Sequence, residues 1–211
     1  MKNEIIVVLD RSGSMGSIKK DMVGGLRSFV EKQAAIGEAG FTLTRFDDMF
    51  EVVHESVPIS AVRIGDDVLD PRGNTALLDA IGKTVVAAGE RFAKMPEAER
   101  PERVALLIVT DGQENASREW KIDAVRELLR KQQDEWKWAV TMLGCGIDAI
   151  QAGAGVGILR GQSLTSSRDP KHVDASFSVA AAAVGSYRST GQVHSYTEDE
   201  RSSTIDSGDH K

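Results

Sequence analysis

The sequence predicts an α/β fold with a doubly wound, mostly parallel central sheet, one antiparallel edge strand and helices on both faces. The first observation is that two short apolar runs, in "IIVVLD" and "RVALLIVTDG", each end at an acidic residue, as strands buried on both faces can do. The second is that stretches with helical spacing separate the apolar runs, and this alternation favours a parallel sheet. With 211 residues, 41% of them hydrophobic, the chain is long enough for one domain with a real core.

The elements of the first half follow from these patterns. After the first strand, apolar residues recur at helical spacing and predict an amphipathic helix over residues 18–39. The stretch "GFTLTRFDDMFEVVHES" alternates around Asp47 and Asp48, which predicts two strands joined by a hairpin. Pro58 ends the second strand, and the alternation of that strand indicates an edge of the sheet. The next segment, "PISAVRIGDDVLDPRGNT", is a loop by its composition.

The second half repeats the alternation of helix and strand. Helical spacing over residues 77–92 and 122–132 predicts two helices, which flank the strand "RVALLIVT". "WKWAVTMLG" predicts a further strand, and residues 163–166 predict a brief one. Asp169 followed by Pro170 is typical of the cap and first turn of a helix, here the last and alanine-rich one.

Composition bounds the domain and its surroundings. We expect a single domain over residues 1–188, and a tail over residues 189–211 that is too polar to offset its ordering entropy and is therefore disordered. The formal net charge of −6 provides no cationic surface, so neither nucleic acid nor an anionic membrane is expected as a partner. The N-terminal apolar run is too short for a signal peptide or a membrane span, which predicts a cytoplasmic protein.

Carboxylates and hydroxyls gather where the predicted strands end. Asp10, Ser12 and Ser14 follow the first strand at alternate positions, so in an extended loop their side chains point to one side. Thr75 begins a helix, and Asp111 follows another strand. In an open α/β sheet, ligands bind at the carboxyl ends of the strands. Hard oxygen donors of this kind suit Mg²⁺, so a metal held at this edge of the sheet is one interpretation of these five residues.

Each of the five residues also has a structural explanation. Asp10 and Ser12 could cap the following helix, Thr75 could be an N-cap, and Asp111 could be a turn residue before a glycine. Capping alone does not readily explain why all five fall at one edge of one sheet. The combination therefore favours a metal site.

The motifs "DRSGSM", "RGNT" and "TDG" resemble the metal-ion-dependent adhesion site of von Willebrand factor type A domains, over about residues 5–187. With "ENAS" after "TDG", the chain is most similar to the stand-alone intracellular bacterial members. The resemblance implies a Rossmann-like fold and a Mg²⁺-dependent protein-binding module that is not an enzyme, with Mn²⁺ or Ca²⁺ as alternative ions. It also implies a protein partner whose Asp or Glu completes the coordination, such as an AAA+ ATPase or a stress-response protein.

The chemistry of the donors fits this implication. Ser12, Ser14 and Thr75 can bind the ion directly as neutral hydroxyls, while Asp10 and Asp111 bind directly or through water. Mostly neutral ligands leave the ion electron-poor and ready for an incoming carboxylate. The rim that touches the partner is expected to include Arg11, Met15, Arg72, Asn74, Gln113 and Glu114.

Two other functions are open from the sequence. One is a Mg²⁺-dependent phosphohydrolase of haloacid-dehalogenase-like type with Asp10 as nucleophile, although Ser12 stands where such enzymes carry a second aspartate as general acid. The other is a scaffold with a vestigial metal site. The glycine-rich "GAGVGI" lies too late in the chain for a dinucleotide site, and Cys145 is interpreted as a packing residue.

Overall fold

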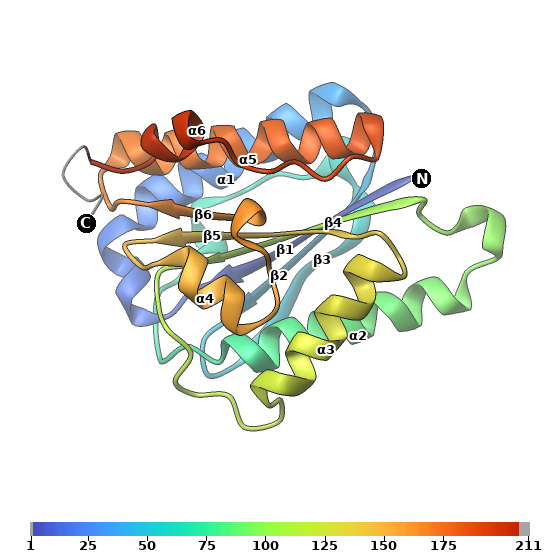
Figure 1. The fold of residues 1–211 in the computed structure, drawn as a ribbon, viewed down its shortest axis with the longest axis horizontal. Helices are drawn as coiled ribbons and strands as arrows, with labels where there is room; N and C mark the ends of the chain where they lie inside the picture. Colours follow the sequence, from blue (N-terminus) through green and yellow to red (C-terminus); the bar gives the residue numbers. More distant parts are fainter. Residues whose placement is uncertain (1, 207–211) are drawn as a thin grey trace.

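Six strands form one sheet in the order β3-β2-β1-β4-β5-β6, in a computed structural model that describes residues 2–206 (Figure 1). The strands are β1 (Asn3–Asp10), β2 (Gly40–Phe46), β3 (Phe50–Pro58), β4 (Arg103–Thr110), β5 (Ala139–Cys145) and β6 (Ser163–Ser166). Neighbouring strands are parallel except β2 and β3, which form an antiparallel hairpin at one edge. The predicted doubly wound, mostly parallel sheet with one antiparallel edge strand is therefore confirmed.

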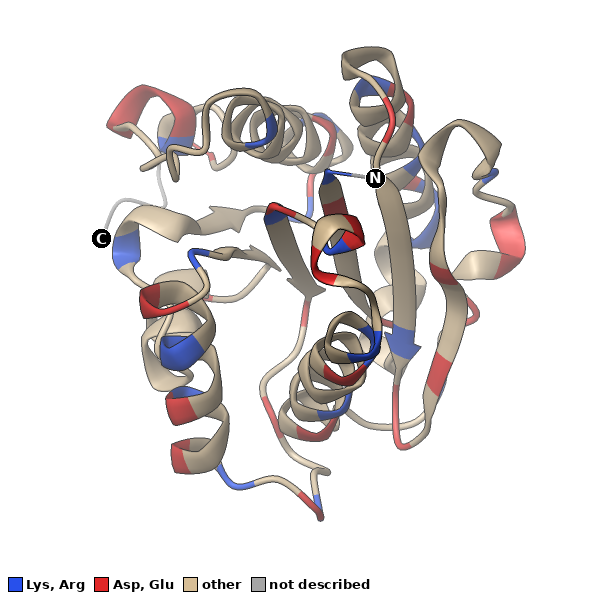
Figure 2. Ribbon diagram, turned by 90° about the vertical axis from the view of Figure 1, so that its right-hand side faces the viewer, with Lys and Arg blue, Asp and Glu red and all other residues tan. Residues whose placement is uncertain are grey.

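Helices cover both faces of this sheet (Figure 1). On one face, α1 (Lys19–Ile36) and α5 (Pro170–Thr190) pack against each other. On the other lie α2 (Leu77–Lys94), α3 (Ile122–Asp134) and the short α4 (Ala149–Gly155). A last short helix, α6 (Glu198–Ser202), follows α5. Lys and Arg alternate with Asp and Glu along the helices on the side drawn in Figure 2.

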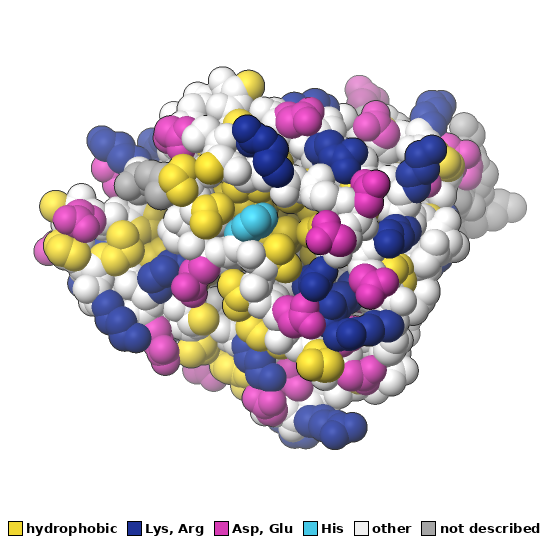
Figure 3. Space-filling model, turned by 180° about the vertical axis from the view of Figure 1, so that it is seen from behind, with side chains coloured by type: hydrophobic (Ala, Val, Ile, Leu, Met, Phe, Trp, Pro, Cys, Tyr) yellow, Lys and Arg dark blue, Asp and Glu magenta, His cyan; other side chains and the backbone are white. Residues whose placement is uncertain are grey.

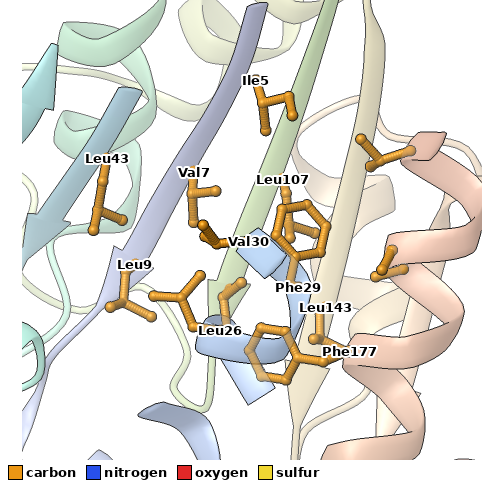
Figure 4. Packing of buried hydrophobic residues seen from close by; sticks show 14 of the residues in the cluster. Ile5, Val7, Leu9, Leu26, Phe29, Val30, Leu43, Leu107, Leu143 and Phe177 are labelled. Carbon is orange, nitrogen blue, oxygen red and sulfur yellow. The ribbon is translucent and has the colours of Figure 1, made fainter. Parts of the chain in front are cut away.

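The central strands are apolar on both faces because each face meets a separate core. In β1, Ile5, Val7 and Leu9 point toward α1 and α5, where they join Phe29 and Phe177 (Figure 4). The intervening residues of the same strand point to the opposite core, beneath α2 and α3. All these side chains are almost completely buried. Continuous apolar runs in the sequence therefore mark strands in the middle of the sheet.

The first predicted helix is confirmed, and a short turn precedes it. Residues Gly13–Ile18 form a 3₁₀ turn, η1, and the α-helix begins only at Lys19. The helix ends at Ile36 because Gly37 has a φ of +137°, which stops the helical path three residues earlier than the predicted end. The predicted cap of the last helix is confirmed, since the Asp169 carboxylate accepts a hydrogen bond from the Lys171 N–H.

The prediction of a disordered tail is wrong for residues 189–206, and residues 207–211 lie outside the described part of the chain. The tail returns along β6, where the Tyr196 N–H donates to the Gly161 carbonyl (2.8 Å) and the Ser167 N–H donates to the Thr204 carbonyl (2.9 Å). The Arg201 guanidinium is buried and donates to the Ser163 carbonyl (2.7 Å). A polar tail is ordered here because it pairs with backbone groups at the edge of the sheet.

The molecule seen from behind shows hydrophobic side chains gathered around a histidine (Figure 3). Among exposed apolar side chains, Met49 in the hairpin turn is 58% exposed and Val52 in β3 is 50% exposed. Such exposure is typical of an antiparallel edge strand with one solvated face.

Within residues 2–206, each helix is too short or too polar to cross a lipid bilayer.

Candidate metal centre

Four of the five predicted ligands are linked at the carboxyl ends of β1 and β4. Asp10 is fully buried, and its two oxygens accept hydrogen bonds from the Ser12 N–H (2.7 Å) and the Thr110 hydroxyl (2.6 Å). The Ser12 and Ser14 hydroxyl oxygens lie 3.1 Å apart. The Ser14 hydroxyl in turn donates to Asp111 Oδ1 (2.7 Å). The polar side chains of the "DRSGS" segment therefore lie on one side, as predicted, although Ser14 belongs to the 3₁₀ turn that begins at Gly13 and not to an extended loop.

Thr75, the fifth predicted ligand, borders the same space. A Cβ atom at Gly112 would lie 2.8 Å from the Thr75 hydroxyl oxygen and 3.7 Å from Asp10 Oδ2. The glycine of "TDG" thus leaves open a small volume between a hydroxyl and a carboxylate from different parts of the chain. All five predicted ligands meet around this part of the fold.

Two residues of "ENAS" hold Thr75 beside Asp111. The Asn115 side-chain oxygen accepts from the Thr75 N–H (2.9 Å), and the Asn115 N–H donates to the Thr75 carbonyl (3.1 Å). The Glu114 carboxylate accepts from the Leu78 N–H (3.0 Å) in the first turn of α2. The loop after β4 is therefore bound directly to the start of α2. Asn115 lies in the "ENAS" motif, but no local pattern indicates its contact with Thr75.

Asp79 fastens the same loop from the α2 side. Its carboxylate accepts three backbone N–H groups, from Arg118 (2.9 Å), Glu119 (3.0 Å) and Trp120 (2.8 Å). Burial acts to raise the pKa of Asp79, but the three donors outweigh burial and hold the pKa below its ordinary value. This carboxylate is consequently an ionised anchor of the loop that carries Asp111.

The side chain of Arg11 lies on the other side of the "DRSGS" segment (residues 10–14, here called the metal loop), so it is not part of the predicted partner-binding rim. Its side chain is buried, with Nη2 2.8 Å from Glu51 Oε1 and Nε 3.2 Å from Asp47 Oδ2. Arg72 also reaches Asp47, with Nε 2.6 Å from Oδ2. This ion network ties the metal loop and the loop before Thr75 to the β2–β3 hairpin. The prediction that Arg11 contacts a partner is therefore wrong.

The other predicted rim residues divide into three groups. Met15 is completely buried in the core beneath α1, so its prediction is wrong as well. Arg72, Asn74 and Gln113 are exposed, although Asn74 also donates to a carboxylate of the hairpin turn. Glu114 is half-buried and is occupied by the α2 N–H described above. Contact of the exposed residues with a partner stays a prediction.

The electrostatics of the site arise from two buried acids. Burial raises the pKa of Asp10 to about 6, against the opposing hydrogen bonds from Thr110 and Ser12, and the neighbouring charge of Asp111 raises it further. The Asp111 side chain is fully buried and pairs with Arg168, whose Nη2 lies 2.8 Å from Asp111 Oδ2. Arg168 comes from the loop between β6 and α5, 57 residues further along the chain, and no pattern around Asp111 indicates it.

The residues present fit a divalent cation with hard oxygen ligands. Two carboxylates and three hydroxyls lie together at this edge of the sheet, and Mg²⁺ or Mn²⁺ prefers such donors. In the described part of the chain, no three His, Cys, Asp or Glu side chains gather closely enough to hold a metal. A metal at this edge therefore depends on the hydroxyls of Ser12, Ser14 and Thr75.

Solved structures identify the fold as that of von Willebrand factor type A domains. A von Willebrand factor type A protein from Catenulispora acidiphila is 17% identical, with a TM-score of 0.60 over 86% of this chain and 42% of that one. The corresponding domain of the pilus tip protein Mfa5 from Porphyromonas gingivalis is 10% identical, with a TM-score of 0.65 over 93% of this chain and 98% of its own. The manganese-loaded TRAP protein of Plasmodium vivax is 13% identical, with a TM-score of 0.59 over 86% of this chain and 71% of its own.

These comparisons establish the fold and nothing finer. No protein-family model matches the sequence, and no curated protein matches it either. The chain spans less than half the length of the Catenulispora protein. The three structures above are only 10% to 17% identical to this chain. Their ligands and partners are therefore properties of those proteins and are not transferred to this chain.

Proposed function

We propose that the chain is a divalent-cation-dependent protein-binding module in which Mg²⁺ binds at a complete metal-ion-dependent adhesion site. The observation that carries the proposal is the convergence of Asp10, Ser12, Ser14, Thr75 and Asp111 at one edge of the sheet. When bound, the ion supplies a Lewis acid for an Asp or Glu carboxylate of the partner. The chain's own hydroxyls hold the ion without adding negative charge, which keeps it attractive to that carboxylate.

The surface beside the site supports a macromolecular partner. A hollow of about 330 Å³ adjoins Gly112 and Gln113, and its lining includes Leu77, Ile122 and Ile147. Ile122 is 44% exposed. Apolar side chains next to a polar anchor are typical of the centre of protein–protein interfaces. A partner that places a carboxylate on the ion can therefore cover apolar surface with its neighbouring residues.

The choice of ion and of partner class follows from the donor set and the resemblance. Hydroxyl-rich octahedral sites favour Mg²⁺, and the manganese-loaded TRAP protein supports Mn²⁺ as an alternative in this fold. Ca²⁺ is the weakest candidate because it prefers more oxygen ligands. The similarity to stand-alone bacterial members favours an intracellular, cytoplasmic partner, such as an AAA+ ATPase or a stress-response protein.

We further propose that the chain is not an enzyme. Both oxygens of Asp10 accept hydrogen bonds, which lowers their nucleophilicity, and Ser12 cannot serve as the general acid of a phosphohydrolase. Incubation with p-nitrophenyl phosphate and Mg²⁺ is expected to give no turnover that depends on Asp10. Turnover lost in Asp10→Asn would favour the phosphohydrolase.

Isothermal titration with Mg²⁺ and Mn²⁺, followed by affinity capture from a lysate of the source organism, tests the module. Thr75→Ala is expected to lose metal binding and any capture that EDTA abolishes. Thr190→Ala removes an exposed hydroxyl at the end of α5 and is the matched control. Absence of Mg²⁺ and Mn²⁺ binding by the unaltered chain, even with an acidic peptide present, would refute the proposal in favour of a scaffold with a vestigial site. Capture that is insensitive to EDTA and to Thr75→Ala would also contradict it.

A further inference from the structure

Arg168 is bound into the candidate metal centre from a distant loop. Its Nη2 lies 2.8 Å from Asp111 Oδ2, and its Nη1 donates to the Ser17 hydroxyl (2.9 Å). Longer contacts of 3.4 Å reach the carbonyls of Asp111 and Ser14. The guanidinium thus bridges the loop after β1 and the loop after β4, while 39% of its side chain stays exposed to solvent.

The neighbouring backbone is shaped to admit this side chain. Gly146, at the end of β5, has a φ of +69°. A Cβ atom there would lie 2.5 Å from Arg168 Nε and 3.1 Å from its Cδ. A side chain at position 146 would therefore displace Arg168 from Asp111. The path of Arg168 across the glycine is a second observation, independent of the ion pair, that the arginine belongs at this site.

Arg168 changes the charge that a divalent cation meets. The two buried acids, Asp10 and Asp111, carry two negative charges when ionised, and Arg168 offsets one of them. The hydroxyl ligands are neutral. Arg11 and Arg72 pair with Asp47 and Glu51 of the β2–β3 hairpin, whereas Arg168 pairs with a predicted ligand itself.

We propose that Arg168 is a built-in counter-ion of this site, which weakens the binding of divalent cations by the chain alone and leaves the occupied site positively charged. This inference rests on the proposed function and deepens it. With Arg168 in place, a partner's carboxylate neutralises the occupied site. Because binding free energies are reciprocally linked, the ion and the acidic partner then each strengthen the binding of the other.

A structural role for Arg168 makes the opposite prediction. If Arg168 served chiefly to hold Asp111 in position, its removal would weaken the binding of the ion. The Ser14 hydroxyl already fixes Asp111 Oδ1, and the residue directly follows β4. We therefore expect the charge of Arg168 to matter more than its support of Asp111.

Calorimetric titration with Mn²⁺ alone separates these possibilities. Arg168→Gln is expected to bind Mn²⁺ about tenfold more tightly than the unaltered chain, as expected when solvent partly screens the loss of one charge near an ion. Arg168→Lys keeps the charge and is expected to stay close to the unaltered chain. Arg160→Gln is the matched control, because Arg160 lines the same surface hollow as Arg168 and is 65% exposed. Circular dichroism verifies that each variant is folded.

Each outcome decides a separate claim. If Arg168→Gln binds Mn²⁺ as tightly as the unaltered chain or more weakly, the counter-ion role of Arg168 is refuted, while the proposed function stays intact. An equal gain in Arg160→Gln would also overturn it, because the effect would then come from overall charge. Binding by Arg168→Gln but not by the unaltered chain would support the counter-ion strongly. If neither the unaltered chain nor Arg168→Gln binds Mn²⁺ or Mg²⁺, the metal site itself is refuted.

Discussion

The buried carboxylate of Asp10 makes the stability of the metal-free protein depend on pH. Burial raises its pKa from the ordinary value of 3.8 to about 6. Between these values the unfolded chain has lost this proton while the folded chain keeps it, so folding stability falls as the pH rises. A difference of about 2 pKa units corresponds to roughly 3 kcal/mol that is lost between about pH 4 and pH 7. A bound divalent cation offsets this cost because it favours the ionised carboxylate.

Asp10→Asn isolates the effect. Its side-chain oxygen can accept from the Ser12 N–H, while its amide donates to the Thr110 hydroxyl, which can donate to the Gly112 carbonyl (3.1 Å). Urea unfolding in EDTA is expected to show the variant about as stable as the unaltered chain near pH 4 and more stable by up to about 3 kcal/mol near pH 7.5. Mn²⁺ should stabilise only the unaltered chain. Identical pH profiles for the two proteins in EDTA would refute this account of Asp10.

Three further perturbations test the site and its support. Gly112→Ala places a Cβ 2.8 Å from the Thr75 hydroxyl oxygen, so Mn²⁺ affinity measured by calorimetry should fall by at least about tenfold. An unchanged affinity would place the ion elsewhere. Asp79→Asn loses an ionised acceptor of three N–H groups, so urea unfolding should show a loss of about 2 kcal/mol. A loss below about 0.5 kcal/mol would mean that this anchor is dispensable. Deletion of residues 191–211 uncovers β6. The shortened chain should therefore melt at a lower temperature and self-associate in size-exclusion chromatography. A monomer with an unchanged melting temperature would contradict the role of the tail.

The sequence was sufficient to predict the sheet because β1 and β4 contact a core on each face. Their apolar runs cannot be satisfied at the surface, so their place at the centre of the sheet follows directly. The five ligand residues were also predictable, because their spacing relative to the strand ends is a local property. The structure brings Asp10, Ser12 and Ser14 together at the end of β1, with Ser14 placed by the 3₁₀ turn that begins at Gly13.

The errors at the rim come from the same alternation. In an extended loop, Arg11 must point away from Asp10 and Ser12, and it enters the ion network of the hairpin. Met15 turns inward because the 3₁₀ turn begins at Gly13 and replaces the extended loop. Arg11 and Met15 each follow a predicted ligand in the sequence. Their side chains point away from that ligand, so they are not on the surface around the site.

The remaining features depend on contacts between distant segments. The tail has the composition of a disordered chain, and contacts with the backbone in and beside β6 hold its described residues in place. Arg168 reaches Asp111 across the start of α5, and Asn115 reaches Thr75 from the next loop. Local patterns contain no information on such pairs until the topology is known.

The hydrogen bonds between the start of α2 and the loop after β4 have a kinetic consequence. Asp79, Glu114 and Asn115 join these segments through backbone groups, and none of these bonds includes a metal ion. Folding itself therefore bears the entropic cost of assembling the ligands, and an arriving cation meets a preformed cage. In the proposed module, entry of the ion is then limited by how fast it sheds its hydration water, and no rearrangement of these two segments has to precede it.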